Sequence, residues 1–221
     1  MENCLIMKKQ ILFCGYRDWA KKIYSSLDND IVFCESSDDF IKLNPKDFDI
    51  AFFVGWSSMV SSSWTDKIMC ICLHPSPLPK YRGGSPIQNQ ILQGEDKSAV
   101  TLFEMNDVVD GGPIIFQKEF SLDGTLVDIF SRIILIGTRL IGRVIKDYKE
   151  GEGIKSKKQD NAEATTYKRR TPDMSEIKIK DFQEYTAKQL YNKIRCLQYP
   201  YPLPFIKCKD NTILYIKDGE F

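Results

Sequence analysis

The sequence predicts an α/β protein with a Rossmann-like, mostly parallel sheet. Four short apolar runs lie in the first third of the chain, and each has the length of a buried strand. Polar stretches separate these runs, and the first stretch carries apolar side chains at helical spacing. Strands that alternate with helices at this interval form a parallel sheet with helices on both faces.

The four predicted strands are bounded by turn and loop residues. Runs 10–15 and 49–55 both end in glycine, and run 69–74 leads into a proline-rich loop. Run 30–34 lies between the first two of these. The first connector is predicted to be helical because it spaces the following apolar residues on one face: Trp19, Ile23, Tyr24 and Leu27.

The rest of the chain continues the α/β pattern. A proline in the first turn predicts a helix over residues 85–94, and a continuous apolar face predicts a long helix over 126–144. The polar, lysine-rich stretch 151–171 is interpreted as a loop or linker. The remaining predicted elements are strands at 99–105 and 113–120, a helix at 181–196, and a hairpin of 205–208 with 213–216.

Composition narrows the class of protein. The 221 residues carry 31 basic and 30 acidic side chains, for a formal net charge of +1, and this balance weighs against nucleic acid as the main partner. The seven cysteines are an odd, scattered set, as in cytosolic proteins with reduced thiols. The apolar run 133–136 is far too short to span a membrane. We expect a cytoplasmic protein without membrane association.

The single histidine of the chain, His74, lies where chemistry is expected. Ligands of parallel sheets bind beyond the carboxyl ends of the strands, and residues 55–57 and 74–76 lie at two such ends. Asp110 follows a predicted neighbouring strand and precedes two glycines that permit a tight turn. A histidine oriented by a carboxylate is a common proton-transfer pair.

Residues 72–86 carry the most specific motif. They read Cys-Leu-His-Pro-Ser-Pro-Leu-Pro-Lys-Tyr-Arg-Gly-Gly-Ser-Pro. This stretch resembles the signature of folate-dependent formyltransferases, Asn-x-His-x-Ser-x-Leu-Pro-x-Tyr-Arg-Gly-x-x-Pro. Residues 100–114 resemble that family's second motif, Val-Thr…Asp-x-Gly, and the resemblance covers roughly residues 10–150. Segments 166–172 and 194–202 are similar to the branch that formylates nucleotide-linked amino sugars.

The resemblance implies a reaction and an organisation. It implies that residues 1–165 form the catalytic domain and that residues 166–221 form a C-terminal helix and hairpin extension. A sugar amine would attack the formyl carbon of 10-formyltetrahydrofolate, and no metal is expected. His74 would accept the proton, and Asp110 would orient His74 and stabilise its protonated form. The implied partner is a nucleotide-linked amino sugar, and a homodimer is one assembly compatible with the sequence.

The resemblance also implies two sets of binding residues. The residues expected to bind the folate are Phe53, Gly55, Trp56, Met105, Asp107, Val108 and Val109. The residues expected to bind the sugar substrate are Ser76, Lys80, Tyr81, Arg82, Gly83, Gly84, Tyr199 and Tyr201. The sequence leaves open the sugar, the nucleotide and the position of the amine.

One position departs from the family pattern. Cys72 stands where the family has the asparagine that donates a hydrogen bond to the oxyanion, and a thiol is a weak donor. Protonated His74 or a backbone amide would supply the donor in a variant site. Alternatively, the protein is a slow enzyme or an inactive relic kept for binding. A covalent formyl thioester on Cys72 is the third explanation.

Other readings of these residues remain. Cys70, Cys72 and His74 share one strand face and offer three ligands for zinc, although their spacing is not that of structural zinc sites. Methionyl-tRNA formyltransferase shares the motif, but it carries a longer basic domain for tRNA. Glycinamide ribonucleotide formyltransferase shares the histidine and the aspartate, but residues 81–86 and the tail fit it poorly.

Overall fold

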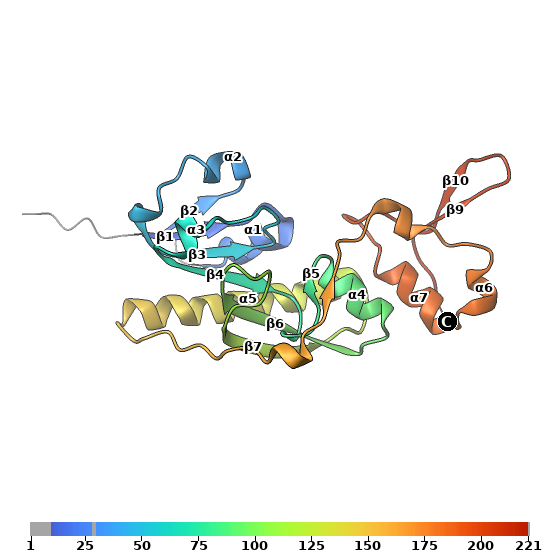
Figure 1. Cartoon of the computed structure of the whole chain (residues 1–221). Helices are drawn as coiled ribbons and strands as arrows, with labels where there is room; N and C mark the ends of the chain where they lie inside the picture. Colours follow the sequence, from blue (N-terminus) through green and yellow to red (C-terminus); the bar gives the residue numbers. More distant parts are fainter. Residues whose placement is uncertain (1–9, 28–29, 221) are drawn as a thin grey trace, which may run out of the picture. The chain divides into compact units, whose positions relative to one another are not determined.

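The computed structural model describes residues 10–27 and 30–220 (Figure 1). Its largest sheet has six strands in the order β2-β1-β3-β4-β6-β7. These strands are β1 (Gln10–Cys14), β2 (Ile31–Cys34), β3 (Phe48–Val54), β4 (Met69–His74), β6 (Lys97–Glu104) and β7 (Ile114–Ser121). The strands predicted in the first third of the chain are β1 to β4, and each forms within a residue or two of its predicted bounds.

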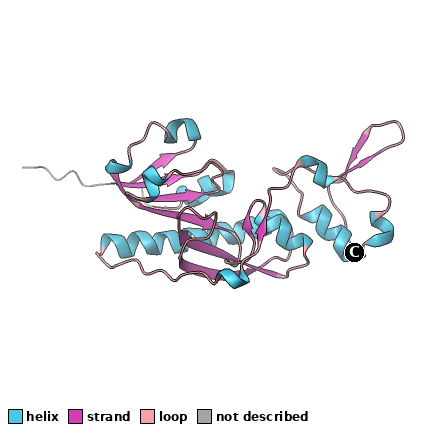
Figure 2. Cartoon of the chain, in the orientation of Figure 1, coloured by secondary structure: helices cyan, strands magenta, loops and turns pink. Residues whose placement is uncertain are grey.

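The sheet is mostly parallel. β1 lies between β2 and β3 and is parallel to both, and β3 is parallel to β4. β6 then pairs with β4 in the antiparallel direction, with Thr101 opposite His74. Figure 2 shows these strands together with the helices around them. The predicted Rossmann-like α/β class is therefore confirmed.

One face of the parallel strands packs against two helices, α1 (Asp18–Tyr24) and α5 (Leu126–Lys149). Gly137 of α5 lies so close to this layer that a β-carbon there would come within 2.8 Å of Leu73 and 2.9 Å of Ile23. Leu73 belongs to β4, and Ile23 belongs to α1. A residue without a side chain is therefore what allows α5 to approach β4 and α1.

The opposite face is covered by two single-turn helices, α2 (Ser37–Phe40) and α3 (Ser62–Thr65). Their aromatic rings, Phe40 and Trp64, lie 4.5 Å apart between centroids and share a buried cluster with Cys70 of β4. Because side chains alternate along a strand, Cys72 and His74 point to this same face. The predicted covering of both faces is confirmed, and β4 presents its cysteines and His74 on the α2–α3 side.

Two glycines of α5 give a matched stability test. Alanine is a better helix former than glycine by about 0.5–1 kcal/mol. At Gly142 a β-carbon would meet nothing within 4 Å, so Gly142→Ala should raise the free energy of unfolding by that amount. At Gly137 overpacking costs about 1–3 kcal/mol, so Gly137→Ala should lower the free energy of unfolding. Urea unfolding measures both, and equal effects of the two substitutions would contradict this packing.

The later elements include two more small sheets. β5 (Arg82–Gly83) pairs in parallel with β8 (Thr166–Tyr167), and β9 (Phe205–Lys207) pairs antiparallel with β10 (Ile213–Tyr215). The second pair is the predicted hairpin. The remaining helices are α4 (Pro86–Leu92), α6 (Asp181–Glu184) and α7 (Ala187–Arg195), and the 3-10 turns are Pro45–Asp47, Asn161–Glu163 and Pro172–Ser175.

One prediction about this region is incomplete and another is wrong. Stretch 151–171 is mostly loop, as predicted, but it also contributes the two-residue strand β8 to a sheet. Residues 181–196 do not form one helix, because Thr186 caps a new helix there. The Thr186 side chain accepts from the Gln189 backbone, and the Gln189 side chain accepts from the Thr186 backbone. The Thr-x-x-Gln pattern is readable in the sequence and marks this break.

The chain divides into two compact units whose segments alternate along the sequence. The first contains residues up to His74 together with 101–117 and 134–159, and the second contains 75–100, 118–133 and 160–221. The boundary between catalytic domain and extension at residue 165 stays a prediction. Within the described ranges, no helix has both the length and the apolar character needed to cross a bilayer.

Candidate active site

His74 and Asp110 meet in the first unit. The Nδ1 atom of His74 lies 3.5 Å from the Oδ2 atom of Asp110, and both side chains are largely buried, with 8% and 15% of their surface exposed. This separation is longer than a tight hydrogen bond, as is common in catalytic pairs before substrate binds. The structure therefore brings together the two residues that the sequence predicts as proton acceptor and orienting carboxylate.

The loop between β6 and β7 carries Asp110 along β4. Because β6 is antiparallel to β4, the loop begins near Cys70, where the Met105 amide donates to the Cys70 carbonyl at 2.7 Å. Asp110, near the end of the loop, lies beside His74. The sequence predicts the proximity of the two residues but not this path, because it does not reveal the direction of β6.

The turn at Asp110 is tightly held. Asp110 adopts a left-handed backbone with φ of 50°, a conformation that is uncommon for residues other than glycine, asparagine and aspartate. Two residues later, a β-carbon on Gly112 would lie 1.7 Å from the Glu104 carbonyl oxygen, so only glycine fits there. The side-chain amide of Gln159 donates to the backbone carbonyls of Asp110 and Gly112 at 2.9 and 2.7 Å.

The sequence does not mark Gln159 as a functional residue. It lies in the polar stretch 151–171, where composition suggests a linker and no motif marks one glutamine among many polar residues. The segment is fixed just before it, because the backbones of Lys157 and Ile114 exchange two hydrogen bonds of 2.8 Å. Gln159 is therefore delivered to the Asp110 turn by a bridge to β7.

Cys72 lies on the same face of β4 as His74 and keeps partial solvent access. Desolvation by the surrounding atoms raises the pKa of its thiol well above the ordinary value, and the nearby Asp110 carboxylate raises it further. The thiol is consequently neutral at physiological pH. A neutral thiol is a poor nucleophile, which weighs against the covalent formyl thioester.

The residues expected to bind folate all lie in the first unit but differ in exposure. Val108 and Val109 are 50% and 56% exposed, which is unusual for valines and suits a loop that contacts a ligand. Asp107 is exposed and Met105 is half-buried in the same loop. Gly55 follows β3 with a left-handed φ of 60°, and its turn carries the chain to Trp56.

Two of these residues, Phe53 and Trp56, pack against aromatic side chains of the hydrophobic core. Phe53 is fully buried and packs edge-on against Phe40 at 5.5 Å between centroids, and its part in folate binding stays a prediction. Trp56 packs against Tyr16, Phe40 and Phe53. Its buried indole N–H has no hydrogen-bond partner within residues 10–27 and 30–220. The Trp56 indole N–H is therefore a hydrogen-bond donor near the end of β3 that no described residue uses.

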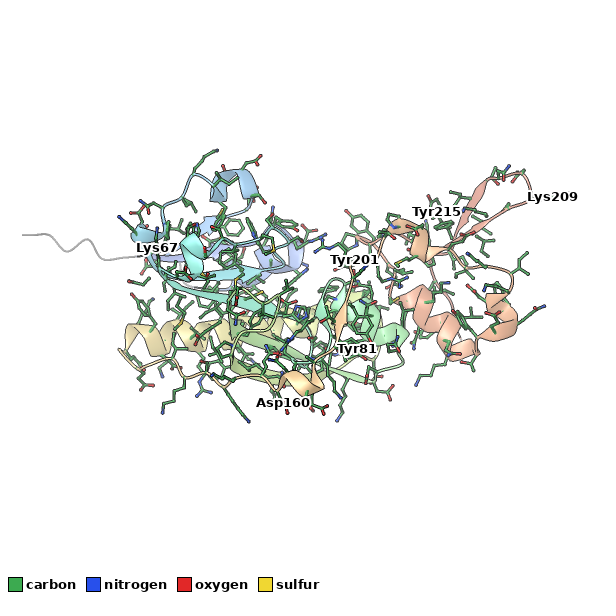
Figure 3. The ribbon with its side chains drawn as sticks, in the orientation of Figure 1. Lys67, Tyr81, Asp160, Tyr201, Lys209 and Tyr215 are labelled. Atoms are coloured by element: carbon green, nitrogen blue, oxygen red, sulfur yellow. The ribbon has the colours of Figure 1, made fainter. Side chains whose placement is uncertain are left out.

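Several residues expected to bind the sugar substrate make contacts within the second unit, and their role in binding stays a prediction. The Ser76 hydroxyl donates to the Lys80 carbonyl at 2.9 Å, and the Arg82 guanidinium, on a residue that is 6% exposed, donates to Asn161 at 2.9 Å. Tyr81, which is labelled in Figure 3, donates to Glu95 at 2.7 Å and stacks on Tyr167. Lys80 is exposed. The chain itself therefore binds polar groups of Ser76, Tyr81 and Arg82 in this structure.

The glycines of the same loop lie against the backbone of a later segment of the chain. A β-carbon on Gly83 would lie 2.3 Å from the Tyr167 carbonyl oxygen, and one on Gly84 would lie 2.3 Å from the Arg169 backbone. The pairing of β5 with β8 explains both, because it requires close backbone approach. Of the two tyrosines in the C-terminal segment, Tyr199 is 81% exposed, whereas Tyr201 is half-buried and stacks on Phe130 at 6.0 Å.

The zinc reading finds no support in the geometry. Within the described ranges, no three side chains of histidine, cysteine, aspartate or glutamate are arranged to hold a metal ion. Cys70 is buried in the apolar cluster with Phe40 and Trp64. Its thiol pKa is raised to about 12 by desolvation, so it is a neutral core side chain.

Comparison with known sequences is consistent with this site. Residues 37–132 match the family model described as Formyl transferase, and this span includes Cys72, His74 and Asp110. The chain is 32% identical over 176 residues to a methionyl-tRNA formyltransferase of Sulfurihydrogenibium sp.. The alignment covers 78% of this chain and 54% of that protein. The chain thus spans about half the length of the curated relatives it matches.

Comparison with solved structures places the fold. A methionyl-tRNA formyltransferase from Clostridium thermocellum superposes with a TM-score of 0.77 at 24% identity, covering 95% of this chain and 97% of that one. WlaRD, a sugar 3N-formyl transferase solved with dTDP and 5-N-formyl-THF, gives a TM-score of 0.68 at 20% identity, covering 88% and 82%. The fold is therefore that of the formyltransferases.

Proposed function

We propose that this protein is a folate-dependent N-formyltransferase that formylates the amine of a nucleotide-linked amino sugar. The observation that carries the proposal is the His74–Asp110 pair, 3.5 Å apart, within a span that matches the formyl transferase model. The structural relative solved with a formylated folate supports 10-formyltetrahydrofolate as formyl donor. The same relative, solved with a nucleotide, supports the sugar acceptor.

The residues at the pair suit this chemistry. The neutral sugar amine attacks the formyl carbon, so a new carbon–nitrogen bond forms and the nitrogen becomes positively charged. His74 takes the surplus proton from that nitrogen, and Asp110 stabilises the imidazolium that results. When the bond from the formyl carbon to N10 of the folate breaks, His74 returns the proton to N10. The products are the formamide and tetrahydrofolate, and no redox step occurs.

The folate would lie against the β6–β7 loop and the end of β3. Val108 and Val109 offer exposed apolar surface there, and the Trp56 indole N–H offers an unused donor among the described residues. These groups fit a flat ring with polar edges. We propose Gly55, Met105 and Asp107 as further residues of this contact.

Methionyl-tRNA is the second candidate acceptor, because the sequence relative with 32% identity acts on it by name. The balance of 31 basic against 30 acidic residues favours the sugar, since tRNA binding relies on an excess of positive charge.

An acceptor panel tests the proposal. The protein is incubated with 10-formyltetrahydrofolate and either nucleotide-linked 3-amino and 4-amino sugars or methionyl-tRNA, and tetrahydrofolate release is followed. We expect a kcat/KM for at least one amino sugar at least about a hundredfold above that for methionyl-tRNA, a difference of about 2.7 kcal/mol in activation free energy. Formylation of methionyl-tRNA alone would establish the second candidate. Folate binding without turnover on any acceptor would identify an inactive binding domain.

A further inference from the structure

We propose that Gln159 is a positioning residue that holds the Asp110 carboxylate against His74. This inference rests on the proposed function for its kinetic consequence, but its structural content is independent of it. The Gln159 amide nitrogen donates to the carbonyl oxygens of Asp110 and Gly112, so both of its hydrogens are used on the two residues that flank Gly111. Gln159 thereby spans the whole turn.

The turn has a backbone conformation that benefits from such support. Asp110 has a φ of 50°, in the left-handed region that is uncommon for residues other than glycine, although aspartate adopts it more readily than most. The loop supplies its own bonds on one side, from Gly111 to the Val108 carbonyl at 3.0 Å and from Val108 to the Asn106 side chain at 3.0 Å. The carbonyls of Asp110 and Gly112 are bound from the other side by Gln159.

Gln159 is itself rigidly placed. The backbone of Lys157, two residues earlier, exchanges hydrogen bonds of 2.8 Å with Ile114, the first residue of β7. Since β7 follows directly on the Asp110 loop, the bridge fixes Gln159 to the same framework. All of these contacts lie within the first unit.

The consequence for His74 follows from the geometry of the pair. A carboxylate that accepts from Nδ1 selects the neutral imidazole with its proton on Nδ1 and leaves Nε2 free to accept a proton. The Nδ1–Oδ2 separation is already 3.5 Å, close to the longest distance at which a hydrogen bond forms. A small further increase in this distance would therefore remove the preference for the Nδ1 proton. Without Gln159 the Asp110 turn can relax, and the ring then loses its fixed tautomer.

The single histidine makes the test direct, because every histidine ring signal in the chain belongs to His74. The protein is labelled with 15N-histidine, and the ring nitrogen shifts are recorded at about pH 9, where an ordinary imidazole is neutral. We expect the wild-type chain to show the proton predominantly on Nδ1. Asp110→Gly, which removes the carboxylate and tolerates positive φ, provides the reference without tautomer selection.

Three variants complete the test. Gln159→Met keeps the side-chain length without a donor, and Gln159→Glu keeps the shape but places acceptors opposite the two carbonyls. Both should move the ring shifts most of the way to those of Asp110→Gly. Lys158→Ala changes the exposed neighbour in the same segment and should leave the wild-type shifts. In the acceptor assay, the Gln159 variants should lose at least about tenfold in kcat with KM for folate within about twofold.

The outcomes separate the two proposals. Wild-type ring shifts in Gln159→Met would overturn the positioning role, whatever the assay shows. Absence of formyl transfer in the wild-type chain would overturn the proposed function, while the ring shifts would still decide the role of Gln159. Loss of the native circular dichroism spectrum in both Gln159 variants would show that the residue supports the fold as a whole, which also overturns a local positioning role.

Discussion

His74→Ala should lower kcat for formyl transfer by about 10²–10⁴-fold, the usual contribution of a positioned general base. The residue is the only histidine of the chain, and its ring is 8% exposed beside Asp110. No second histidine can therefore replace it. Because the proton moves only after the amine attacks, the substitution should spare ground-state binding, and KM should change little.

Two measurements make this prediction specific. Added imidazole should restore part of the activity of His74→Ala, because the deleted ring leaves space for it, and a purely structural histidine would not be rescued in this way. Calorimetry with 5-formyltetrahydrofolate should give the wild-type affinity. Near-normal turnover of His74→Ala on the accepted sugar would contradict the mechanism.

Asp110→Asn tests the partner of the same pair. Asparagine tolerates the left-handed backbone of residue 110 and keeps the shape of the side chain, so the turn should persist. The substitution removes the negative charge that stabilises protonated His74 and replaces one acceptor oxygen by an NH2 donor. We expect a fall in kcat that is smaller than that of His74→Ala, and the double variant should lose little more than His74→Ala alone, because the two residues act as a unit.

Much of this site could be predicted from the sequence because its signals are local. The apolar run at 69–74 predicts β4, and the period of two places Cys72 and His74 on one face. The glycines after Asp110 indicate a tight turn, and the turn carries a left-handed residue. Each of these features depends on residues that are neighbours in the chain.

The remaining features depend on contacts between distant parts of the chain. Gly83 and Gly84 lie against backbone more than eighty residues later, at Tyr167 of β8 and at Arg169 just beyond it. Gln159 reaches back to Asp110 from a stretch whose composition resembles a linker. Composition and periodicity carry no information on which distant segments pair, so neither contact could be predicted.

Cys72→Asn should raise the rate of formyl transfer. The tetrahedral oxyanion of the proposed reaction needs a hydrogen-bond donor, and an amide N–H is a much better donor than a thiol. A lost donor of this kind costs about 3 kcal/mol, or roughly 10²-fold in rate, so restoring one could recover up to that factor. The side chain at residue 72 shares a face of β4 with His74 and keeps partial solvent access.

Comparison of three substitutions at this position separates the explanations of Cys72. If the thiol is only a weak donor, Cys72→Ala should change kcat by less than about fivefold, and Cys72→Asn should increase it. If His74 or a backbone amide already supplies the donor, all three of Cys72→Ala, Cys72→Ser and Cys72→Asn should stay near the wild-type rate. If a formyl thioester forms, alanine and asparagine should both abolish transfer.

The raised pKa of Cys72 makes the thioester the outcome we do not expect. Desolvation and the Asp110 charge both disfavour the thiolate, so the nucleophilic form is scarce at neutral pH. Cys70→Ala is the matched control, because Cys70 lies two residues earlier on the same face but inside the apolar cluster. It should lower stability without changing kcat. A large fall in kcat for Cys72→Asn, with Cys70→Ala unchanged, would show that the Cys72 thiol has a chemical role of its own.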